Sequence, residues 1–423
     1  MRVLVIGGGG REHALTARLA QDRDVGELVV APGNPGIAAL ARTVPLDLGR
    51  PEGALALADR EQIDLTIVGP ELPLSLGIAD RFASEQRLLF GPTSAAARLE
   101  SSKAFAKAFM ARHDIPTARF ETSESAGQAL DLVRGGTFGW PVVLKADGLA
   151  AGKGVVIAAD LAAAEAAIVG MMRDRKFGAA GDRLVVEECL TGPEVSFFAI
   201  SDGVRALPIG TAQDHKRIFD DDRGPNTGGM GAFAPSPLID SPMHARVMRE
   251  IIDPVVAGMA AEGYPFRGFL YAGLMLTPSG PKVIEFNARL GDPEAQVILP
   301  LIEEPLLPIL VAGAAGVLRQ TTVRVGADRQ VCVVLASRGY PESAESGRPI
   351  RGIEDAEAIP GVAVYHAGTA WRDRQLVTAG GRVLTVAGRG RDFAEAAVCA
   401  YSGVQQISFD GMQYRHDIGR KAL

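Results

Sequence analysis

Short apolar runs alternate with segments of helical apolar spacing along the first hundred residues. The runs at 2–7 (RVLVIG), 27–33 (ELVVAPG) and 64–70 (DLTIVGP) end in glycine or proline, and 11–21 (REHALTARLAQ) has the apolar spacing of a helix. This alternation indicates a parallel, Rossmann-like sheet with helices on both faces. Because such sheets bind ligands at the carboxyl ends of their strands, the loops that follow these strands are candidate binding loops.

The pattern changes near residue 100, where we place the first domain boundary. A helix is expected to begin at Ser101 or Ser102 and to end before Pro116. Strands and helices are mixed beyond it, so the chain reads as an α/β and α+β multidomain protein. The expected domains are an N-terminal Rossmann-like domain (1–100), a small α+β lobe with a linker helix (101–190), a larger mixed lobe (191–322) and a C-terminal β-rich domain (323–423).

The polar, glycine-rich stretch at 211–237 (TAQDHKRIFDDDRGPNTGGMGAFAPSP) is expected to be a loop. It is too long to be a mere connector between two elements. Loops of this length inside compact domains are functional or disordered.

Composition excludes several classes of protein. The 47% hydrophobic and 22% charged residues are ordinary for a soluble globular chain, and no apolar stretch approaches the roughly 18 residues of a membrane span. No signal peptide opens the chain, and Cys189, Cys332 and Cys399 make neither a disulfide framework nor a zinc cluster, so we expect a cytoplasmic protein. The net charge of −6 argues against nucleic acid as a partner and leaves phosphorylated small molecules, because a local site can still be basic.

The segment 145–156 (KADGLAAGKGVV) suggests a phosphate-binding loop. It is not a Walker loop, because Gly148 and Gly152 are one residue too close and Gly154 replaces the Ser or Thr that would bind Mg²⁺. What remains is a glycine-rich hairpin with Lys153 at its tip. An ordinary β-hairpin turn is the alternative.

A candidate metal site lies in 283–294 (VIEFNARLGDPE). In a strand, Glu285 and Asn287 share one face while Phe286 points into the core. Two oxygen donors suit Mg²⁺, which typically completes its shell with phosphate oxygens and water. The expected neighbouring strand offers no further acid, so a metal here depends on a bound nucleotide. A merely polar strand face is equally consistent with the spacing.

Four further charged positions are weak signals by themselves. Lys103 opens a helix and Lys145 ends a strand, and either is an ordinary solvated lysine when it is considered alone. Glu187 and Glu188 end another strand, where exposed backbone groups can pair with an adenine edge while a carboxylate takes ribose hydroxyls. Their order along the chain is more informative than any one of them.

That order resembles the ATP-grasp fold, in which two α+β lobes clamp ATP. More specifically, the chain resembles the glycinamide ribonucleotide synthetase family from residue 2 to RHDIG near its end. The resemblance implies ATP-dependent ligation of glycine to 5-phosphoribosylamine through glycyl phosphate, in the second step of purine synthesis. The stretches that carry it are GGGGREHA, IVGPE, FGPT, KADGLAAGKGV, QDHKR, GPNTGGMGA, GFLYAGLM and VIEFNARLGDPE.

The resemblance also implies roles for individual residues, with Mg²⁺ or Mn²⁺ on Glu285 and Asn287. The segment that contains Gly152, Lys153 and Gly154 becomes a flap over the phosphates of ATP. Catalytic roles fall to Lys145, Lys153 and Arg289. The expected ATP-binding residues are Lys103, Lys145, Gly152, Lys153, Gly154, Glu187, Glu188, Leu190 and Glu194.

The site for glycine and 5-phosphoribosylamine is expected where the N-terminal glycine loop meets the segment 211–237. The loop precedes a helix and offers backbone N–H groups for the 5′-phosphate. A dinucleotide fingerprint is the alternative, but no acidic residue ends the second strand. Arg289 binds an anionic oxygen or pairs with Asp292 or Glu294. The expected substrate-binding residues are Gly9, Gly10, Arg11, Glu12, Asp214, His215, Lys216, Arg217, Asn226, Thr227, Gly228, Gly229, Arg289 and Asp292.

Two alternatives stay open beside this interpretation. One is another ATP-grasp ligase of purine synthesis, such as an enzyme that makes a carboxylated aminoimidazole ribotide, although GPNTGGMGA argues against it. The other is a nucleotide-binding regulatory protein, which would need a damaged metal site, whereas Glu285, Asn287, Lys103 and Lys145 are all present. We expect a monomer.

Overall fold

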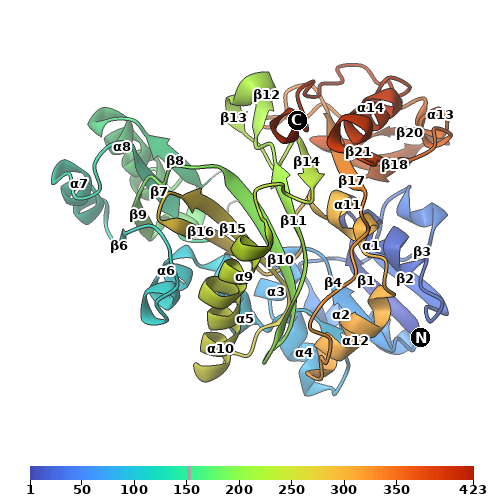
Figure 1. Ribbon diagram of the computed structural model, residues 1–423, viewed down its shortest axis with the longest axis horizontal. Helices are drawn as coiled ribbons and strands as arrows, with labels where there is room; N and C mark the ends of the chain where they lie inside the picture. The colour runs from blue at the N-terminus through green and yellow to red at the C-terminus, as the bar shows by residue number, and fades with distance from the viewer. Residues whose placement is uncertain (150–153) are drawn as a thin grey trace.

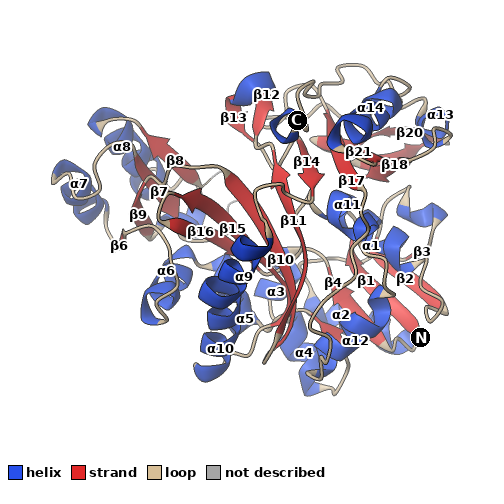
Figure 2. Ribbon diagram, in the orientation of Figure 1, coloured by secondary structure: helices blue, strands red, loops and turns tan. Residues whose placement is uncertain are grey.

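The computed structural model describes residues 1–149 and 154–423 (Figures 1 and 2). Gly152 and Lys153, two of the predicted flap residues, lie outside the described residues. No helix in the described ranges is long and apolar enough to cross a membrane. The described strands form sheets of five, eight and four strands together with two short hairpins.

The N-terminal sheet is parallel, as predicted, with the order β3-β2-β1-β4-β5. The order changes direction at β1, so the loops after β1 and β4 flank the crevice in which sheets of this kind bind ligands. Helices α1 (Gly10–Leu19) and α3 (Glu71–Ser75) begin in those two loops. The strands are β1 (Arg2–Gly7), β2 (Glu27–Pro32), β3 (Arg42–Thr43), β4 (Leu65–Val68) and β5 (Leu89–Phe90).

Two helices lead from this sheet toward the small lobe. Helix α5 spans Ser94–Ser101, and α6 spans Lys103–Arg112. The side chain of Ser102 caps α6 by accepting a hydrogen bond from the backbone N–H of Phe105 at 3.1 Å. The prediction of a helix start at Ser101 or Ser102 is therefore confirmed.

The small lobe is a four-stranded antiparallel sheet with the order β6-β9-β7-β8, covered by helices α7 (Ala126–Arg134) and α8 (Leu161–Ile168). It projects at the left of Figure 1, away from the two ends of the chain. Leu144, Val186 and Ile168 are fully buried in its own core. Its strands are β6 (Phe120–Ser123), β7 (Val142–Ala146), β8 (Val155–Ala158) and β9 (Leu184–Glu188).

The eight-stranded sheet has the order β16-β15-β10-β11-β14-β17-β21-β18, and its strands pair antiparallel throughout. It contains strands from both the expected large lobe and the expected C-terminal domain, so the boundary at 322 stays a prediction. The strands are β10 (Glu194–Asp202), β11 (Ala206–Asp214), β14 (Gly231–Ala234), β15 (Arg267–Thr277), β16 (Gly280–Asn287), β17 (Arg329–Ala336), β18 (Val362–His366) and β21 (Arg382–Gly390).

Helices cover this sheet along its length (Figure 2). Helix α12 (Leu306–Ala315) packs between the sheet and the N-terminal domain, where it contacts β10 and β5. Helix α14 (Phe393–Val404) covers β21 and β17. The remaining elements are α2 (Pro51–Arg60), α4 (Ile78–Ser84), α9 (Ser241–Val247), α10 (Asp253–Ala261), α11 (Ala295–Ile298), α13 (Ile353–Glu357) and the hairpin β19 (Thr369–Arg372) and β20 (Gln375–Thr378).

The prediction of one long loop at 211–237 is wrong. The segment contains the end of β11, the hairpin β12 (Arg217–Phe219) and β13 (Arg223–Asn226), and then β14. The hairpin residues show no apolar alternation, because β12 and β13 pair only with each other and β13 is exposed. The turn at 226–229 connects β13 to β14.

Candidate active site

One cavity of about 630 Å³ brings together most of the residues that the sequence singled out. It is lined by loops of the N-terminal sheet, by α6, by the small lobe, by β16 and by residues near β17 and β21. The predicted residues among its lining are Arg11, Lys103, Lys145, Gly154, Glu187, Glu188, Leu190, Glu194, Asp214, Lys216, Asn226, Thr227, Gly228, Glu285, Asn287, Arg289 and Asp292.

The charge of this cavity is mixed. Its described lining includes seven basic and nine acidic side chains. The lining as a whole is therefore not a basic pocket, and a polyanion that binds here needs local lysines and further positive charge.

Glu285 and Asn287 lie on one face of β16, as predicted. Both line the cavity, while Phe286 between them is 2% exposed and also packs in the core. Burial alone would raise the pKa of Glu285, but the nearby cations outweigh it and lower the pKa, so the carboxylate is ionised at neutral pH. These cations are Lys216, Lys145, Lys103 and Arg289. The described residues contain no group of three or more His, Cys, Asp and Glu side chains that could hold a metal.

Lys145 is bound at the base of the cavity rather than solvated. Its Nζ lies 2.5 Å from Glu187 Oε1 and donates to the Ile284 carbonyl at 3.0 Å. Glu187 Oε2 lies 2.5 Å from Nζ of Lys107, a residue of α6 that is only 2% exposed. Lys107 also donates to Thr117 Oγ1 at 2.8 Å.

Thr117 completes this arrangement. Its hydroxyl donates to the Val283 carbonyl at 2.7 Å, so the polar chain begins and ends on neighbouring carbonyls of β16. We call Lys107, Thr117, Lys145 and Glu187 the interlobe clamp, because they connect α6, β7 and β9 to the strand that carries Glu285. Burial lowers the pKa of Lys107 to about 8, although Glu187 opposes the shift.

The glutamates near the end of β9 differ in their surroundings. Glu188 pairs with Arg119 at 2.7 Å, which leaves Glu187 as the buried partner of the lysines. Glu188 N donates to the Arg119 carbonyl, so this backbone donor is already used. Leu190, two residues further along the chain, lines the cavity.

Lys216 stands between two acids. Its Nζ lies 2.6 Å from Glu194 Oε2, and although burial opposes it, the charges of Asp214 and Glu194 hold the pKa of Lys216 well above its usual range. Burial raises the pKa of Asp214 to about 7. A carboxyl that titrates near neutral pH beside an ammonium group can accept or release a proton.

His215 and Arg217 do not line the cavity, although both were predicted with Asp214 and Lys216. Successive side chains alternate along an extended chain, so these two point away. His215 is 1% exposed beside Phe233, and burial lowers its pKa to about 4. Arg217 Nη1 donates to the Gly224 carbonyl within the β12–β13 hairpin at 2.7 Å.

In the glycine loop before α1, the side chains of Glu12 and Asp292 lie against Gly9 and Gly10. Glu12 Oε2 accepts the backbone N–H of Gly9 at 2.7 Å, and Glu12 is 4% exposed, so it caps its own helix. A Cβ added at Gly9 or Gly10 would lie 3.8 or 3.5 Å from the Asp292 carboxylate oxygens. Asp292 therefore approaches the start of α1, and among the first-turn residues it is Arg11 that reaches the cavity.

The alternative in which Arg289 pairs with Asp292 or Glu294 is not what the structure shows, and its predicted contact with an anionic oxygen of a substrate stays a prediction. Arg289 instead pairs with Glu71 at 3.2 Å and with Glu100 at 2.9 Å. These acids belong to helices α3 and α5, more than 180 positions earlier in the chain. Arg289 also lines the cavity, so one guanidinium connects the N-terminal loops to the end of β16.

Four charged residues of the lining were given no role from the sequence: Lys107, Glu71, Glu100 and Arg382. Lys107 lies four residues after Lys103, so the two share a helix face, and this spacing was the available signal. Glu71 is the last residue of the stretch IVGPE, which contributes to the family resemblance, but the sequence analysis assigned it no role. Arg382 and its neighbour Tyr340 had no sequence signal that we can identify.

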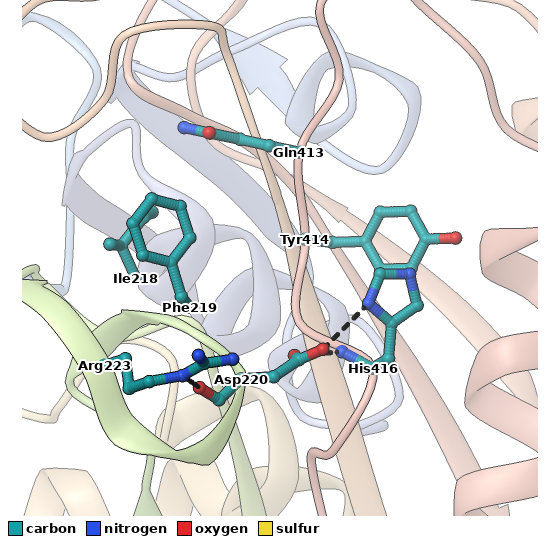
Figure 3. A pocket seen from close by; sticks show the side chains of 7 residues that line it. All are labelled: Ile218, Phe219, Asp220, Arg223, Gln413, Tyr414 and His416. Carbon is teal, nitrogen blue, oxygen red and sulfur yellow. Dashed lines mark hydrogen bonds and ion pairs between the residues drawn. The ribbon is translucent and has the colours of Figure 1, made fainter.

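A second cavity of about 390 Å³ lies between the β12–β13 hairpin and residues 413–416 (Figure 3). His416 and Asp220 form an ion pair across it at 3.2 Å, and the ring of Tyr414 lies beside His416. None of the residues that line it was predicted to be functional.

Comparisons with known proteins converge on one family. Residues 1–100, 101–295 and 330–421 match the family models described as the N domain, the ATP-grasp (A) domain and the C domain of phosphoribosylglycinamide synthetase. A phosphoribosylamine–glycine ligase of Xylella fastidiosa is 50% identical and aligns over 100% of this chain and 98% of its own.

Solved structures agree with this match. A phosphoribosylamine–glycine ligase of Thermotoga maritima has a TM-score of 0.84 and 35% identity, covering 99% of this chain and 100% of its own. An N5-carboxyaminoimidazole ribonucleotide synthetase of the same organism has a TM-score of 0.63 but only 17% identity, over 96% of this chain and 99% of its own. The second likeness extends to the fold alone.

Proposed function

The chain belongs to the phosphoribosylglycinamide synthetase family, whose reaction is the ATP-dependent ligation of glycine to 5-phosphoribosylamine in purine biosynthesis, and from this premise we propose how the cavity carries that reaction out. Glycine is first phosphorylated on its carboxylate, and the amine of phosphoribosylamine then attacks glycyl phosphate and releases inorganic phosphate. Activation is needed because an amine does not displace oxide from a carboxylate, whereas phosphate is a good leaving group.

ATP occupies the part of the cavity that the small lobe lines. Its adenine edge pairs with the backbone at Leu190, and Glu188 and Glu194 are the candidate partners of the ribose hydroxyls. Lys103 and Lys145 bind the phosphates, and the clamp holds Lys145 in place for that contact. The support is that Lys103, Lys145 and Leu190 line one cavity with Glu285.

Glu285 and Asn287 hold Mg²⁺, or alternatively Mn²⁺, against the nucleotide. The ionised Glu285 and the amide oxygen of Asn287 are hard donors that fit such an ion, and the mixed charge of the cavity fits a need for one. When bound, the ion offsets charge on the transferring phosphoryl group. Lys103 and Lys145 supply further positive charge from the protein side.

Glycine and phosphoribosylamine occupy the part of the cavity beside Arg11, Arg289 and the turn at 226–229. Arg289 lines the cavity and is the candidate partner of the glycine carboxylate, although Glu71 and Glu100 also hold its guanidinium, and Arg11 lies at the start of α1 for the phosphate. The raised pKa of Asp214 suits it to take up the proton that the attacking amine loses, and Lys216 beside it retains the positive charge.

The observation that carries this proposal is the convergence of Lys103, Lys145, Glu285, Asn287 and Arg289 on one cavity. A coupled ADP-release assay, with glycine and phosphoribosylamine omitted in turn, tests it. Full ADP release should need both substrates. ADP release that ignores glycine but responds to aminoimidazole ribotide and bicarbonate would instead support the related ligase. ATP binding without turnover would support a regulatory protein.

We further propose that the chain acts as a cytoplasmic monomer with domain divisions near residues 100, 190 and 322. The buried core of the small lobe, which is separate from the other clusters, supports the second division. Size-exclusion chromatography with light scattering tests the monomer directly.

A further inference from the structure

The turn at 226–229 is held by two side chains that lie far along the chain. The hydroxyl oxygen of Tyr340 accepts the backbone N–H of Gly228 at 2.9 Å, and Arg382 Nη1 donates to the Gly228 carbonyl at 2.7 Å. These partners lie 112 and 154 positions after the turn. Both peptide groups of Gly228 are therefore fixed from outside the turn.

Arg382 also binds the segment that follows β16. Its Nη1 donates to the Asp292 carbonyl at 2.5 Å, and its Nη2 lies 3.1 Å from Asp292 Oδ2. Burial alone would lower the pKa of Arg382, but Asp292 outweighs it and raises the pKa, so the guanidinium stays charged. One side chain thus connects the turn to the segment that carries Arg289.

Glycines make this close packing possible. A Cβ at Gly381 would lie 2.3 Å from Cδ2 of the Tyr340 ring, and a Cβ at Gly229 would lie 2.5 Å from Pro293 Cδ. Gly229 also has a φ of +112°, which residues with side chains rarely adopt. The turn, Tyr340 and the segment 292–293 consequently fit against one another with little room for movement.

The contacts of Arg382 place it in the part of the cavity that is assigned to glycine and phosphoribosylamine. Asp292 approaches Gly9 and Gly10 at the start of α1, whereas Lys107, Val143 and Leu190 line the part assigned to ATP. Arg382, Tyr340 and Gly228 line the same cavity. Resting on the proposed function, we propose that Arg382 and Tyr340 are positioning residues that fix the turn 226–229 for phosphoribosylamine and set the affinity for that substrate rather than for ATP.

Two conservative variants test this proposal, Arg382→Lys and Tyr340→Phe. Lysine keeps the charge, but it lacks the planar guanidinium with which Arg382 binds Gly228 and Asp292 at the same time. Phenylalanine removes only the hydroxyl that accepts the Gly228 N–H. The matched control is Arg389→Lys, on the same strand β21, where the arginine forms an exposed pair with Asp328.

The measurements are kcat, KM for each of the three substrates, Tm, and calorimetric binding of the product glycinamide ribonucleotide in the presence of ADP. Because Arg382→Lys loses hydrogen bonds that a charged group donates, we expect about a tenfold to hundredfold rise in KM for phosphoribosylamine and a similar loss of product affinity for this variant. Tyr340→Phe should show a smaller change in the same direction. KM for ATP and Tm should stay near the wild-type values.

A purely structural role predicts a different pattern. Equal increases in KM for ATP and phosphoribosylamine, a fall in Tm with no change in product affinity, or unchanged kinetics in both variants would each overturn the proposal. The combined variant adds a further criterion, because two residues that act through one turn should have non-additive effects. If the wild-type chain itself forms no glycinamide ribonucleotide, the proposed function fails, and that result is distinguishable from a wild-type chain whose Arg382→Lys variant is unaffected.

Discussion

At the scale of single residues, Glu285 is an acid whose neighbours decide its charge. Burial favours its neutral form, but the surrounding cations lower its pKa below the ordinary value. An ionised carboxylate that is surrounded by positive groups is suited to bind a metal only when a polyanion arrives to balance those groups. The strand face that it shares with Asn287 makes the pair the centre of the proposed chemistry.

Replacing Glu285 with alanine should reduce ADP formation about a hundredfold or more while the fold is kept, because the variant loses a charge partner of the phosphoryl group in a water-poor site. Turnover by coupled assay and Tm are the two measurements. Glu303→Ala removes an exposed glutamate paired with Arg324 and should leave both unchanged. Near-wild-type turnover of Glu285→Ala at ordinary Mg²⁺ would remove Glu285 from the site.

His215 should affect stability rather than catalysis. Its pKa of about 4 in the fold lies below the ordinary value, so the unfolded chain binds a proton first as the pH falls. The stability of the folded protein is then unaffected above about pH 6.5 and falls between about pH 6.5 and 4, by about 2 kcal/mol at pH 5 from this residue. His215→Leu should show a smaller drop in Tm between pH 7 and pH 5 than wild type, with turnover kept.

Two outcomes would contradict that view of His215. An unchanged acid sensitivity would mean that the histidine does not titrate as a buried group. A more than tenfold loss of turnover in His215→Leu would indicate that His215 belongs to the substrate site, as the sequence predicted. His416, which is exposed, supplies the control variant His416→Gln.

Sequence patterns recovered the residues that carry recognisable motifs and missed their partners. Lys145 and Glu187 were found, but Lys107, the second lysine that pairs with Glu187, was not, because an isolated lysine on a helix is ordinarily solvated. Arg289 was found, but its partners Glu71 and Glu100 were not, since they come from a distant part of the chain. Such pairs form only when the N-terminal domain and β16 meet, and no local spacing encodes that meeting.

At the scale of elements, the interlobe clamp is the feature that relates the small lobe to the metal strand. It joins α6, β7 and β9 to the carbonyls of Val283 and Ile284, directly before Glu285. The three charged side chains of the clamp are at most 4% exposed, so their ion pairs are screened less than surface pairs are. Its geometry sets where Lys145 stands relative to Glu285.

Lys107→Met should therefore raise KM for ATP by about tenfold and lower the free energy of unfolding by about 1–3 kcal/mol, because Glu187 then keeps only one cation. Thr117→Val should show the same direction at a smaller magnitude. Arg112→Met, on the same helix, removes an exposed pair with Glu262 and should change stability by well under 1 kcal/mol. A variant at Lys107 that binds ATP like wild type would show that the clamp does not position Lys145.

The elements themselves were largely predictable from apolar periodicity. Strands β1, β2 and β4 coincide with the three predicted apolar runs, and β7, β9 and β16 contain the strand positions expected for Lys145, Glu187 and Glu285. The hairpin β12–β13 was not predicted, because its strands are short, polar and paired only with each other. Side-chain alternation then explains why Asp214 and Lys216 reach the cavity while His215 and Arg217 do not.

At the scale of the whole molecule, the eight-stranded sheet joins the ATP-grasp region to the C-terminal region without a break. Strand β21 belongs to this sheet, and its Arg382 lines the same cavity as Arg11 from α1, although the two residues stand near opposite ends of the chain. The continuity of this sheet could not be predicted from sequence, because strand order within a sheet depends on long-range pairing such as that of β14 with β17.

The central claim is that the assembled cavity activates the carboxylate of glycine. Glycine labelled with oxygen-18 in its carboxylate tests this claim most directly, with the isotopic content of the released inorganic phosphate as the measurement. If glycyl phosphate forms, one carboxylate oxygen becomes the bridge to phosphorus and leaves with it, so the phosphate carries the label. Phosphate free of oxygen-18, with all of the label in glycinamide ribonucleotide or unreacted glycine, would contradict the account.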